Sequence, residues 1–273
     1  GRAPTIVNGA VMANFRNADS LFASFIYGEG PDFVAEVDES DGSIAHYNPK
    51  LAILSNITID HKPIEELKTL FSAYLSRAKM VVANLDNAEV AALADAVTDK
   101  PCATFSLTNP CANVYGIKSA DGSWRVKGAD GLSHALTLLV FGDYNVSNAL
   151  AAIAAAEILG VPRGDAVRHL STFKGVARRM EAVGQPRGVA VFDDFGHNPD
   201  KIAASLAALR ERFGRLLCLF QPHGYRPLEI MGRELVETFV EGLRPQDHLW
   251  MTDPVYFGGS VEKKPVVEAL LAQ

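Results

Sequence analysis

The stretch FVAEVDESDGSIAHYNPKLAILSNITIDH, residues 33–61, organises the rest of the chain. It contains two apolar runs, 33–35 and 51–56, and each is typical of a buried strand that leads into polar residues. The first run leads into acidic residues that begin with Glu36, and the second continues to His61. Ligands of parallel α/β sheets bind beyond the carboxyl ends of the strands, so these side chains are candidates for one metal site. An ordinary acidic turn followed by a structural histidine is the alternative, because carboxylates occur in many contexts.

Composition limits the classes of protein to which the chain can belong. It has 273 residues, of which 48% are apolar, and this length suits two domains or one large domain. The net charge is −6, so the basic surface of a nucleic-acid-binding protein is absent and no nucleic-acid partner is expected. No apolar run reaches the roughly 18 residues of a membrane span, and the first residues lack the features of a signal peptide. We therefore expect a cytoplasmic protein without a membrane partner.

The three cysteines, Cys102, Cys111 and Cys218, are scattered along the chain. Their spacing matches no metal-binding motif, and an odd number cannot form a complete set of disulfides. We expect three free thiols, in keeping with a reducing compartment.

Residues 51–98 alternate between strand and helix patterns. Residues 63–79 begin with a proline and carry apolar side chains at helical spacing, and residues 87–98 form a second helical segment rich in alanine. A short β run at 80–84 separates them. With the two strands of 33–61, this alternation predicts a mostly parallel sheet.

Residues 101–141 have a different character. Short β runs are expected at 102–107, 113–118, 124–127 and 135–141, and turns that include Asp121-Gly122 separate them. This pattern predicts a small antiparallel extension without a catalytic role.

An alanine-rich helix is expected within 141–161, and two asparagines lie near its start. Asn145 and Asn148 are three residues apart, so they share one face of the helix. An asparagine amide offers both a donor and an acceptor to the edge of a heterocycle. Capping of the helix by Asp143 or Asn145 is an equally simple explanation.

A second domain is expected after the 173–176 segment. Strands at 188–192, 216–220 and 248–252 alternate with helices at 199–212 and 227–242, and each strand leads into polar residues. Asp194 and His197 follow the first strand, His223 the second and Asp253 the third. Three such ends in register predict a site at the carboxyl edge of the sheet, although for each histidine on its own a structural role is the simpler explanation.

Arg178 and Arg179 precede the first strand of this domain. Guanidinium groups in fixed positions bind phosphate well. A solvated surface pair is the alternative.

Six segments along the chain together suggest a family. EVDESDGS, ITIDH, DYNVSNALAAIAAAEILGV, GVARRMEAVG, DDFGHNPDKI and FQPHGY, in this order, resemble the motifs of the Mur ligase family, most closely its UDP-N-acetylmuramate–L-alanine ligase branch. Each motif alone is weak, but the ordered set spans nearly the whole chain.

This resemblance implies an α/β protein with two partial domains. Residues 1–174 would form a mostly parallel central ATPase domain, and residues 175–273 a dinucleotide-fold-like C-terminal domain. The implied enzyme uses ATP and Mg²⁺ to join an amino acid to UDP-N-acetylmuramate in peptidoglycan precursor synthesis. The substrate carboxylate first becomes an acyl phosphate, and the amine then attacks it. Such chemistry needs positive charge at the phosphates and a domain that closes over them.

The resemblance also implies roles for particular residues. Each expected site residue takes the role of the family position that it matches. Glu36 and His61 would bind metal, Asn145 and Asn148 adenine, and Arg179 phosphate. Asp194 and His197 would serve the nucleotide and the catalytic centre, and His223 would contact the incoming amino acid.

The chain departs from the family pattern in several places. No G-x-x-x-x-G-K-[ST] phosphate loop occurs, so the resemblance implies a fragment that begins downstream of this loop, ends early and is inactive alone. Tyr144 replaces a usual histidine, and Gly224 replaces the arginine of the related QPHRY motif. The loss of that cation leaves the acceptor open, and a ligase that recycles murein tripeptide is a second reading. A non-catalytic nucleotide-binding module is a third, and the sequence does not determine the oligomeric state.

Overall fold

The computed structural model describes residues 3–17, 20, 23–40, 42–58 and 62–254. The chain divides into two compact units, residues 1–177 and residues 178–273. The sequence-based domain assignment of 1–174 and 175–273 stays a prediction.

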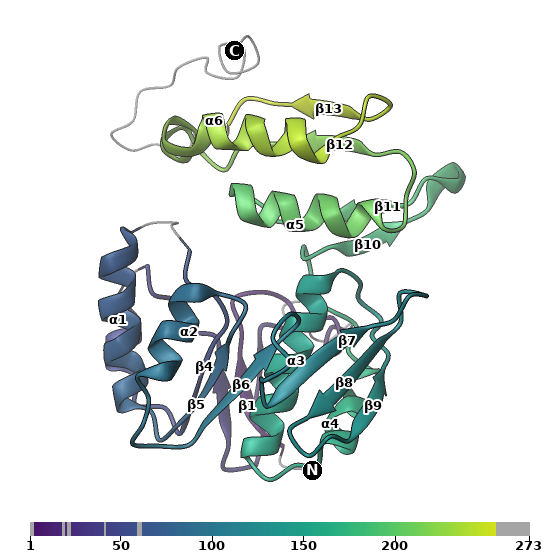
Figure 1. Ribbon diagram of the computed structural model, residues 1–273. Coiled ribbons are helices and arrows are strands. Elements are labelled where there is room, and N and C mark those ends of the chain that lie inside the picture. The colour runs from purple at the N-terminus through teal and green to yellow at the C-terminus, as the bar shows by residue number, and fades with distance from the viewer. Residues whose placement is uncertain (1–2, 18–19, 21–22, 41, 59–61, 255–273) are drawn as a thin grey trace. The chain divides into compact units, whose positions relative to one another are not determined.

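The first unit alternates strands with helices over residues 51–106, and runs of successive strands come before and after this part (Figure 1). Its elements in chain order are β1 (Thr5–Val7), β2 (Phe25–Ile26), β3 (Phe33–Ala35), the 3₁₀ helix η1 (Ser43–His46), β4 (Leu51–Leu54), α1 (Ile64–Arg77), β5 (Met80–Asn84), α2 (Ala88–Asp95), β6 (Cys102–Ser106), β7 (Val114–Lys118), β8 (Trp124–Gly128), β9 (Ser133–Leu136), α3 (Asp143–Ile158) and α4 (Arg163–Leu170).

A six-stranded sheet in the order β4-β5-β6-β7-β8-β9 forms the centre of this unit. The pairs from β4 to β7 are parallel, and β7, β8 and β9 pair antiparallel. The predicted α/β class with a mostly parallel sheet is confirmed. The expectation that residues 102–107 belong to an antiparallel extension is wrong, because β6 pairs parallel with both of its neighbours.

Helices cover both faces of the six-stranded sheet. Successive side chains of a strand point to opposite faces, and β5 shows this directly. Val81 and Ala83 pack into one core cluster with α1 and α2, whereas Val82 packs into another with α3 and α4. All three side chains are fully buried. This explains why β5 has an unbroken apolar sequence, as strands buried on both faces do.

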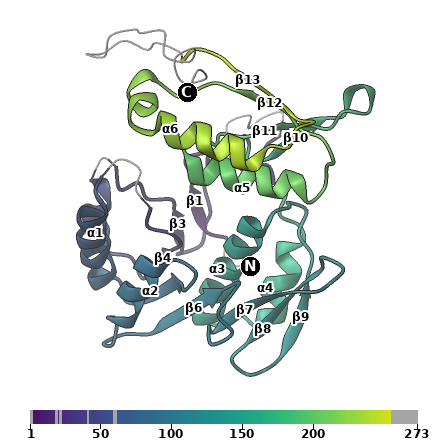
Figure 2. The same ribbon diagram turned by 45° about the horizontal axis from the view of Figure 1, so that its top comes forward.

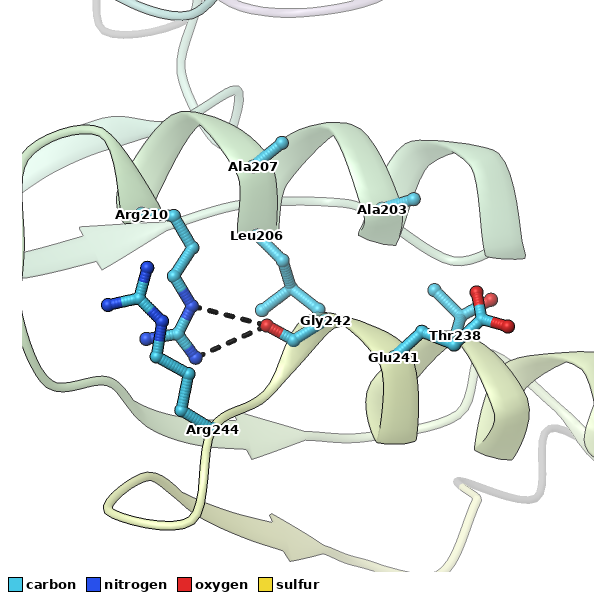
Figure 3. Close-up of a pocket in the computed structure, with 8 residues that line it drawn as sticks. All are labelled: Ala203, Leu206, Ala207, Arg210, Thr238, Glu241, Gly242 and Arg244. Carbon is cyan, nitrogen blue, oxygen red and sulfur yellow. Dashed lines mark hydrogen bonds between the residues drawn. The ribbon is translucent and has the colours of Figure 1, made fainter.

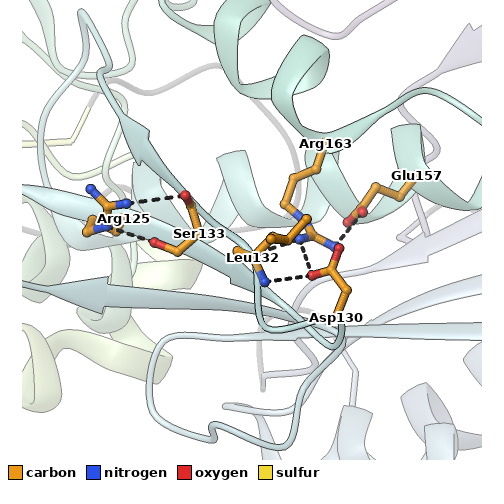
Figure 4. Close-up of polar contacts among 6 residues, drawn as sticks. All are labelled: Arg125, Asp130, Leu132, Ser133, Glu157 and Arg163. Carbon is orange, nitrogen blue, oxygen red and sulfur yellow. Dashed lines mark hydrogen bonds and ion pairs between the residues drawn. The ribbon is translucent and has the colours of Figure 1, made fainter.

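Arg163 links the end of the sheet to the helices α3 and α4, which lie side by side in Figure 2. Its guanidinium donates to Asp130 Oδ1 (2.8 Å) in the β8–β9 turn and to Glu157 Oε1 (2.7 Å) in α3, as Figure 4 shows. Its side chain is 9% exposed. A Cβ at Gly128 would lie 1.8 Å from Arg163 Nη2, so only glycine permits this close approach.

The sheet β2-β1-β3 is separate from the six-stranded sheet. β1 pairs antiparallel with β2 and parallel with β3. The expectation that 33–35 is a buried strand is wrong, since Phe33 and Val34 are 62% and 53% exposed. β3 pairs only with β1, and no core cluster of the described residues includes either side chain.

Over residues 178–254, the described part of the second unit, there are two small sheets and two long helices. β12 precedes α6 in the sequence and β13 follows it, and the two strands pair in parallel, as expected for a βαβ unit. Both strands pack with the two helices around a core that includes Leu206, Phe220 and Leu235. Its elements are β10 (Glu181–Gly184), the 3₁₀ helix η2 (Pro186–Gly188), β11 (Val191–Asp193), α5 (Pro199–Arg210), β12 (Leu217–Phe220), α6 (Tyr225–Gly242) and β13 (His248–Met251).

The predicted three-stranded carboxyl edge of this unit is wrong in one respect. β11 pairs antiparallel with β10, and β12 pairs with β13, so the first strand belongs to a different sheet from the other two. β11 pairs with β10 instead of with β12, and the sequence pattern did not predict β10.

The general properties of the chain agree in part with expectation. All three cysteines are free thiols. Among the described helices, none combines the length and the apolar character that crossing a membrane requires.

Candidate functional site

Glu36, the first acid after β3, is tied to the neighbouring strand β1. Its N–H donates to Val7 O (3.0 Å), and Gly9 N–H donates to Glu36 Oε2 (2.7 Å). The residue is exposed. A Cβ at Gly9 would lie 3.0 Å from the same oxygen, so glycine gives the carboxylate room to approach the backbone. The carboxylate is therefore fixed in direction while it remains open to solvent.

The expected partner of Glu36 lies outside the described residues. The structure describes neither Asp60 nor His61, so a shared site of Glu36 and His61 stays a prediction. Over the described parts of the chain, no three His, Cys, Asp or Glu residues are grouped as a metal would require. Asp38, the next acid, instead accepts the N–H of Ser40 (2.7 Å) in a local turn.

The two asparagines of α3 differ in what they contact. Asn145 Nδ2 donates to Phe141 O (2.8 Å) in the preceding turn, whereas Asn148 is exposed and makes no hydrogen bond within the described residues. The capping alternative is wrong, because Gly142 occupies the cap position with φ 93° and no side chain caps the helix. Asp143 instead pairs with Lys118 Nζ (3.0 Å). Asn148 therefore keeps its amide available for a ligand.

A polar cluster joins the ends of β5 and β6. Asp86 accepts hydrogen bonds from the hydroxyls of Ser106 and Thr108 and from the N–H groups of Leu107 (2.7 Å) and Thr108 (3.2 Å). Partial burial raises the pKa of Asp86, but the Leu107 N–H and the other donors lower it more, so this pKa lies below its ordinary value. Only the strand-end position of Asp86 signalled this role.

Asp194, directly after β11, holds three segments of the second unit together. It accepts Met180 N–H at Oδ1 (2.9 Å), and it accepts Gly196 N–H (3.2 Å) and the Ser205 hydroxyl (2.6 Å) at Oδ2. Both carboxylate oxygens are thus engaged within the protein. Asp194 orders the turn before β10, the loop after β11 and α5.

The two arginines that the sequence singled out both lie near the ring of Phe195. The guanidinium carbons of Arg178 and Arg179 lie 4.7 and 5.7 Å from the centre of its ring. Cations at this distance from an aromatic face are attracted by its negative charge density. Arg178 also lies 3.6 Å from Asp193 Oδ2. Both arginines are nonetheless exposed, so the alternative of a solvated surface pair stays open.

The two histidines meet beside the same phenylalanine. Phe195 lies edge-on to both rings, with centroid distances of 5.3 Å to His197 and 5.6 Å to His223, and the two imidazoles are 5.7 Å apart. His197 Nδ1 is 3.0 Å from Phe195 O, and its Nε2 is 3.3 Å from Lys201 Nζ. A carbonyl only accepts and an ammonium only donates, so we assign the proton of His197 to Nδ1 and the lone pair to Nε2.

The second unit thus brings together four of the predicted residues from three chain segments: Arg179, Asp194, His197 and His223. The sequence reading missed Phe195, Lys201 and Ser205. Lys201 stands four residues after His197, which is a spacing that could have revealed it. Ser205 gave no local signal.

A cavity of about 380 Å³ lies between α5 and α6 and contains none of the predicted residues (Figure 3). Arg210 lines it and donates from Nε and Nη2 to Gly242 O (3.2 Å each), where α6 ends. It also pairs with Asp247, whose side chain is fully buried. These contacts satisfy the last carbonyls of a helix, so we assign Arg210 a structural role.

Two family models match the chain. Residues 20–156 match the Mur ligase middle domain, and residues 178–270 match the glutamate ligase domain of Mur ligases.

Relatives and a solved structure agree with these matches. The UDP-N-acetylmuramate–L-alanine ligase of Desulfotalea psychrophila is 35% identical over 93% of this chain and 55% of its own length. The corresponding ligase of Pelotomaculum thermopropionicum is 32% identical over 99% of this chain and 60% of its own length. The crystal structure of UDP-N-acetylmuramate–alanine ligase from Thermotoga maritima has the same fold, with a TM-score of 0.70 and 24% identity over 92% of this chain and 61% of that one.

The chain therefore spans little more than half the length of the curated relatives it matches. The middle-domain model alone covers half of the chain, and the second model covers most of the remainder. The chain belongs to the Mur ligase family.

Proposed function

We propose that this chain is part of an ATP-dependent ligase that joins an amino acid to UDP-N-acetylmuramate in peptidoglycan precursor synthesis. The observation that carries the proposal is the cluster around Phe195, where two guanidinium groups and two imidazoles meet on one ring. Amide formation from a carboxylate and ATP needs such cations beside a transferring phosphoryl group. The relatives that share the family and match 93% and 99% of this chain are named as L-alanine ligases.

The proposed roles follow from the chemistry of each side chain. Arg179 binds phosphate oxygens, with Arg178 beside it on Phe195, and lowers the energy of the charge that develops during transfer. Asn148 presents its amide to the adenine edge, with Asn145 fixed one turn earlier. Asp194 contributes to the nucleotide side by ordering the backbone around it.

The acceptor amine must lose a proton as it attacks the acyl phosphate. His197 accepts at Nε2 from Lys201 Nζ, so it can take this proton once that hydrogen bond is broken, and it is the proposed group of the catalytic centre that handles the proton. His223, with its ring 5.7 Å from that of His197, is proposed to contact the incoming amino acid. Gly224 follows it at the start of α6 and offers no side chain, so the acceptor side has lost a cation relative to the QPHRY pattern.

Mg²⁺ is the proposed metal. Its preferred ligands are hard oxygens such as carboxylates, and Glu36 presents an exposed carboxylate of which only Oε2 accepts a hydrogen bond among the described residues. Glu36 would hold the ion together with His61. When bound, Mg²⁺ supplies positive charge that offsets the charge of the transferring phosphate. The proposed setting is the cytoplasm.

Phosphate release by the full-length protein tests the proposal. The assay combines ATP, Mg²⁺ and UDP-N-acetylmuramate with L-alanine, glycine, L-serine or the murein tripeptide, and mass spectrometry identifies the amide. We expect release only when all substrates are present. Arg179→Ala is expected to lower kcat on the order of 10²-fold, because the cation acts in the transition state. Arg233→Ala, an 85% exposed arginine of α6, is the matched control.

The possible results separate the readings. Product with the tripeptide and none with single amino acids would replace the proposal with a recycling ligase. Binding of ATP without turnover for any acceptor would favour a non-catalytic nucleotide-binding module.

A further inference from the structure

The turn that carries the two arginines adopts an unusual backbone conformation. Arg178 has φ 58° and Met180 has φ 50°, so both lie in the left-handed region, although neither is glycine. Side chains clash with the backbone there, and such residues persist only where the surrounding structure holds them. The turn therefore needs partners that fix it, and these partners decide where Arg178 and Arg179 point.

Among the described residues, three hydrogen bonds hold this turn. Phe195 N–H donates to Arg178 O (2.8 Å), Arg178 N–H donates to Glu181 Oε2 (3.0 Å), and Met180 N–H donates to Asp194 Oδ1 (2.9 Å). Only the last bond reaches Met180, the second left-handed residue. The orientation of the Asp194 carboxylate is therefore decisive for this half of the turn.

Ser205 sets that orientation. Its hydroxyl donates to Asp194 Oδ2 at 2.6 Å, and the same oxygen accepts Gly196 N–H (3.2 Å). With Oδ2 held from two sides, Oδ1 points to Met180 N–H. Ser205 lies on α5 beside Ile202 and Leu206, whose side chains are buried in the core of the second unit and anchor the helix.

The direction of the Ser205 hydroxyl is unusual for a helix. A serine or threonine within a helix commonly donates to a carbonyl one turn earlier. Thr238 in α6 does so, to Glu234 O (2.8 Å), and Thr69 in α1 does so, to Glu65 O (2.9 Å). Ser205 instead donates out of its helix to a carboxylate, which makes a hydrogen bond to a charged group and a stronger one.

We propose that Ser205 is the positioning residue for the phosphate-side arginines: through Asp194 it locks the left-handed turn at Met180 and so places Arg178 and Arg179 on Phe195. What the arginines bind rests on the proposed function, whereas the lock itself does not. Loss of the hydroxyl frees the carboxylate to rotate, and the turn relaxes away from its strained conformation.

Amide hydrogen exchange in the full-length protein tests the lock without reference to activity. In Ser205→Ala, we expect exchange of the peptide that covers residues 178–184 to accelerate at least 10-fold, while exchange within α5 stays unchanged. Ser205→Thr keeps the hydroxyl and is expected to exchange like the wild type. Thr238→Ala removes a hydroxyl that serves only its own helix, and it should leave residues 178–184 unchanged. Unchanged exchange in Ser205→Ala would overturn the proposal, and so would equal acceleration throughout α5, since that indicates a general loss of stability.

Kinetics of the same variants test the consequence for catalysis. We expect Ser205→Ala to lower kcat about 10-fold with little change in KM for ATP, and Ser205→Thr to restore it, because misplaced cations matter most in the transition state. Faster exchange with unaltered kcat would overturn the positioning role. Faster exchange in a protein that turns over none of the tested acceptors would leave the lock standing and count against the proposed function.

Discussion

Replacing Asp86 removes an acceptor of four hydrogen bonds that join the end of β5 to the loop after β6. In Asp86→Ala, the Ser106 hydroxyl, in a side chain that is fully buried, loses its acceptor. An unsatisfied buried hydroxyl costs about 1–3 kcal/mol, while the other donors are exposed and water replaces Asp86 at little cost. We therefore expect the free energy of unfolding of the first unit to fall by about 2 kcal/mol. Asp86→Asn keeps one acceptor oxygen and should lose about half as much.

Acid should reduce the difference in the free energy of unfolding between the wild type and Asp86→Asn. The pKa of Asp86 lies below its ordinary value of 3.8 in the folded protein, so the ionised carboxylate stabilises the fold. That stabilisation is complete above the ordinary value and is lost as the pH falls through the lower, folded pKa. The gap between the two proteins should thus be constant from about pH 5 to 7 and shrink below about pH 3.8.

Urea unfolding followed by tryptophan fluorescence measures these effects. The two tryptophans lie in different units, so Trp250→Phe leaves Trp124 in β8 as the reporter of the first unit. Asp121→Asn is the control, because among the described residues Asp121 accepts hydrogen bonds only from Ser123, within one turn. The reasoning is refuted if Asp86→Ala shifts the midpoint no more than Asp121→Asn does, or if the gap to Asp86→Asn is the same at pH 3.5 and pH 7.

Three further predictions concern the first unit, and urea unfolding checks each. Gly128→Ala should lower the free energy of unfolding by about 1–3 kcal/mol, since its Cβ would displace the buried guanidinium of Arg163. When Gly128→Ala is made in a protein that already carries Arg163→Ala, the loss should be much smaller. Equal losses in the two backgrounds would contradict this explanation. Asn87→Ala should cost about 1 kcal/mol, because Asn87 caps α2 by accepting Val90 N–H (3.0 Å), and Asn87→Asp should recover most of it. Leu150→Ala should cost about 2–5 kcal/mol, since this α3 side chain is 0% exposed; a cost below 1 kcal/mol would show that the core collapses around the cavity.

Local patterns predicted most of the helices and strands. The helical spacing in 63–79 became α1, and the apolar run at 80–84 became β5, because both patterns record which face of a short segment is buried. Which strands pair with one another was harder to predict from the sequence. Nothing in 102–107 shows that β6 has parallel neighbours on both sides, and β10 was missed because Glu181–Gly184 has no alternation of apolar and polar residues.

For the candidate site, too, the sequence predicted some features and only the structure showed others. The residue types and their place after strands were sufficient to select Arg179, Asp194, His197 and His223, and a resemblance to Mur ligases gave them roles. The structure added how they are held. The sequence offered adenine and phosphate partners as side chains, whereas the fold shows Asn145 bonded to the backbone and Asp194 to two N–H groups and a hydroxyl.

By itself, the sequence determined the α/β class, the family and the order of most helices and strands, though not β1, β2 or β10, because each depends on periodicity or on short motifs along the chain. Only the tertiary structure decided which strand ends share a sheet, and that Ser205, eleven positions after Asp194 in the printed sequence, supports the carboxylate that fixes the turn at Met180. Such contacts depend on the packing of separate elements. The Ser205 hydroxyl meets Asp194 because the apolar neighbours of Ser205 bury α5 in the core of the second unit.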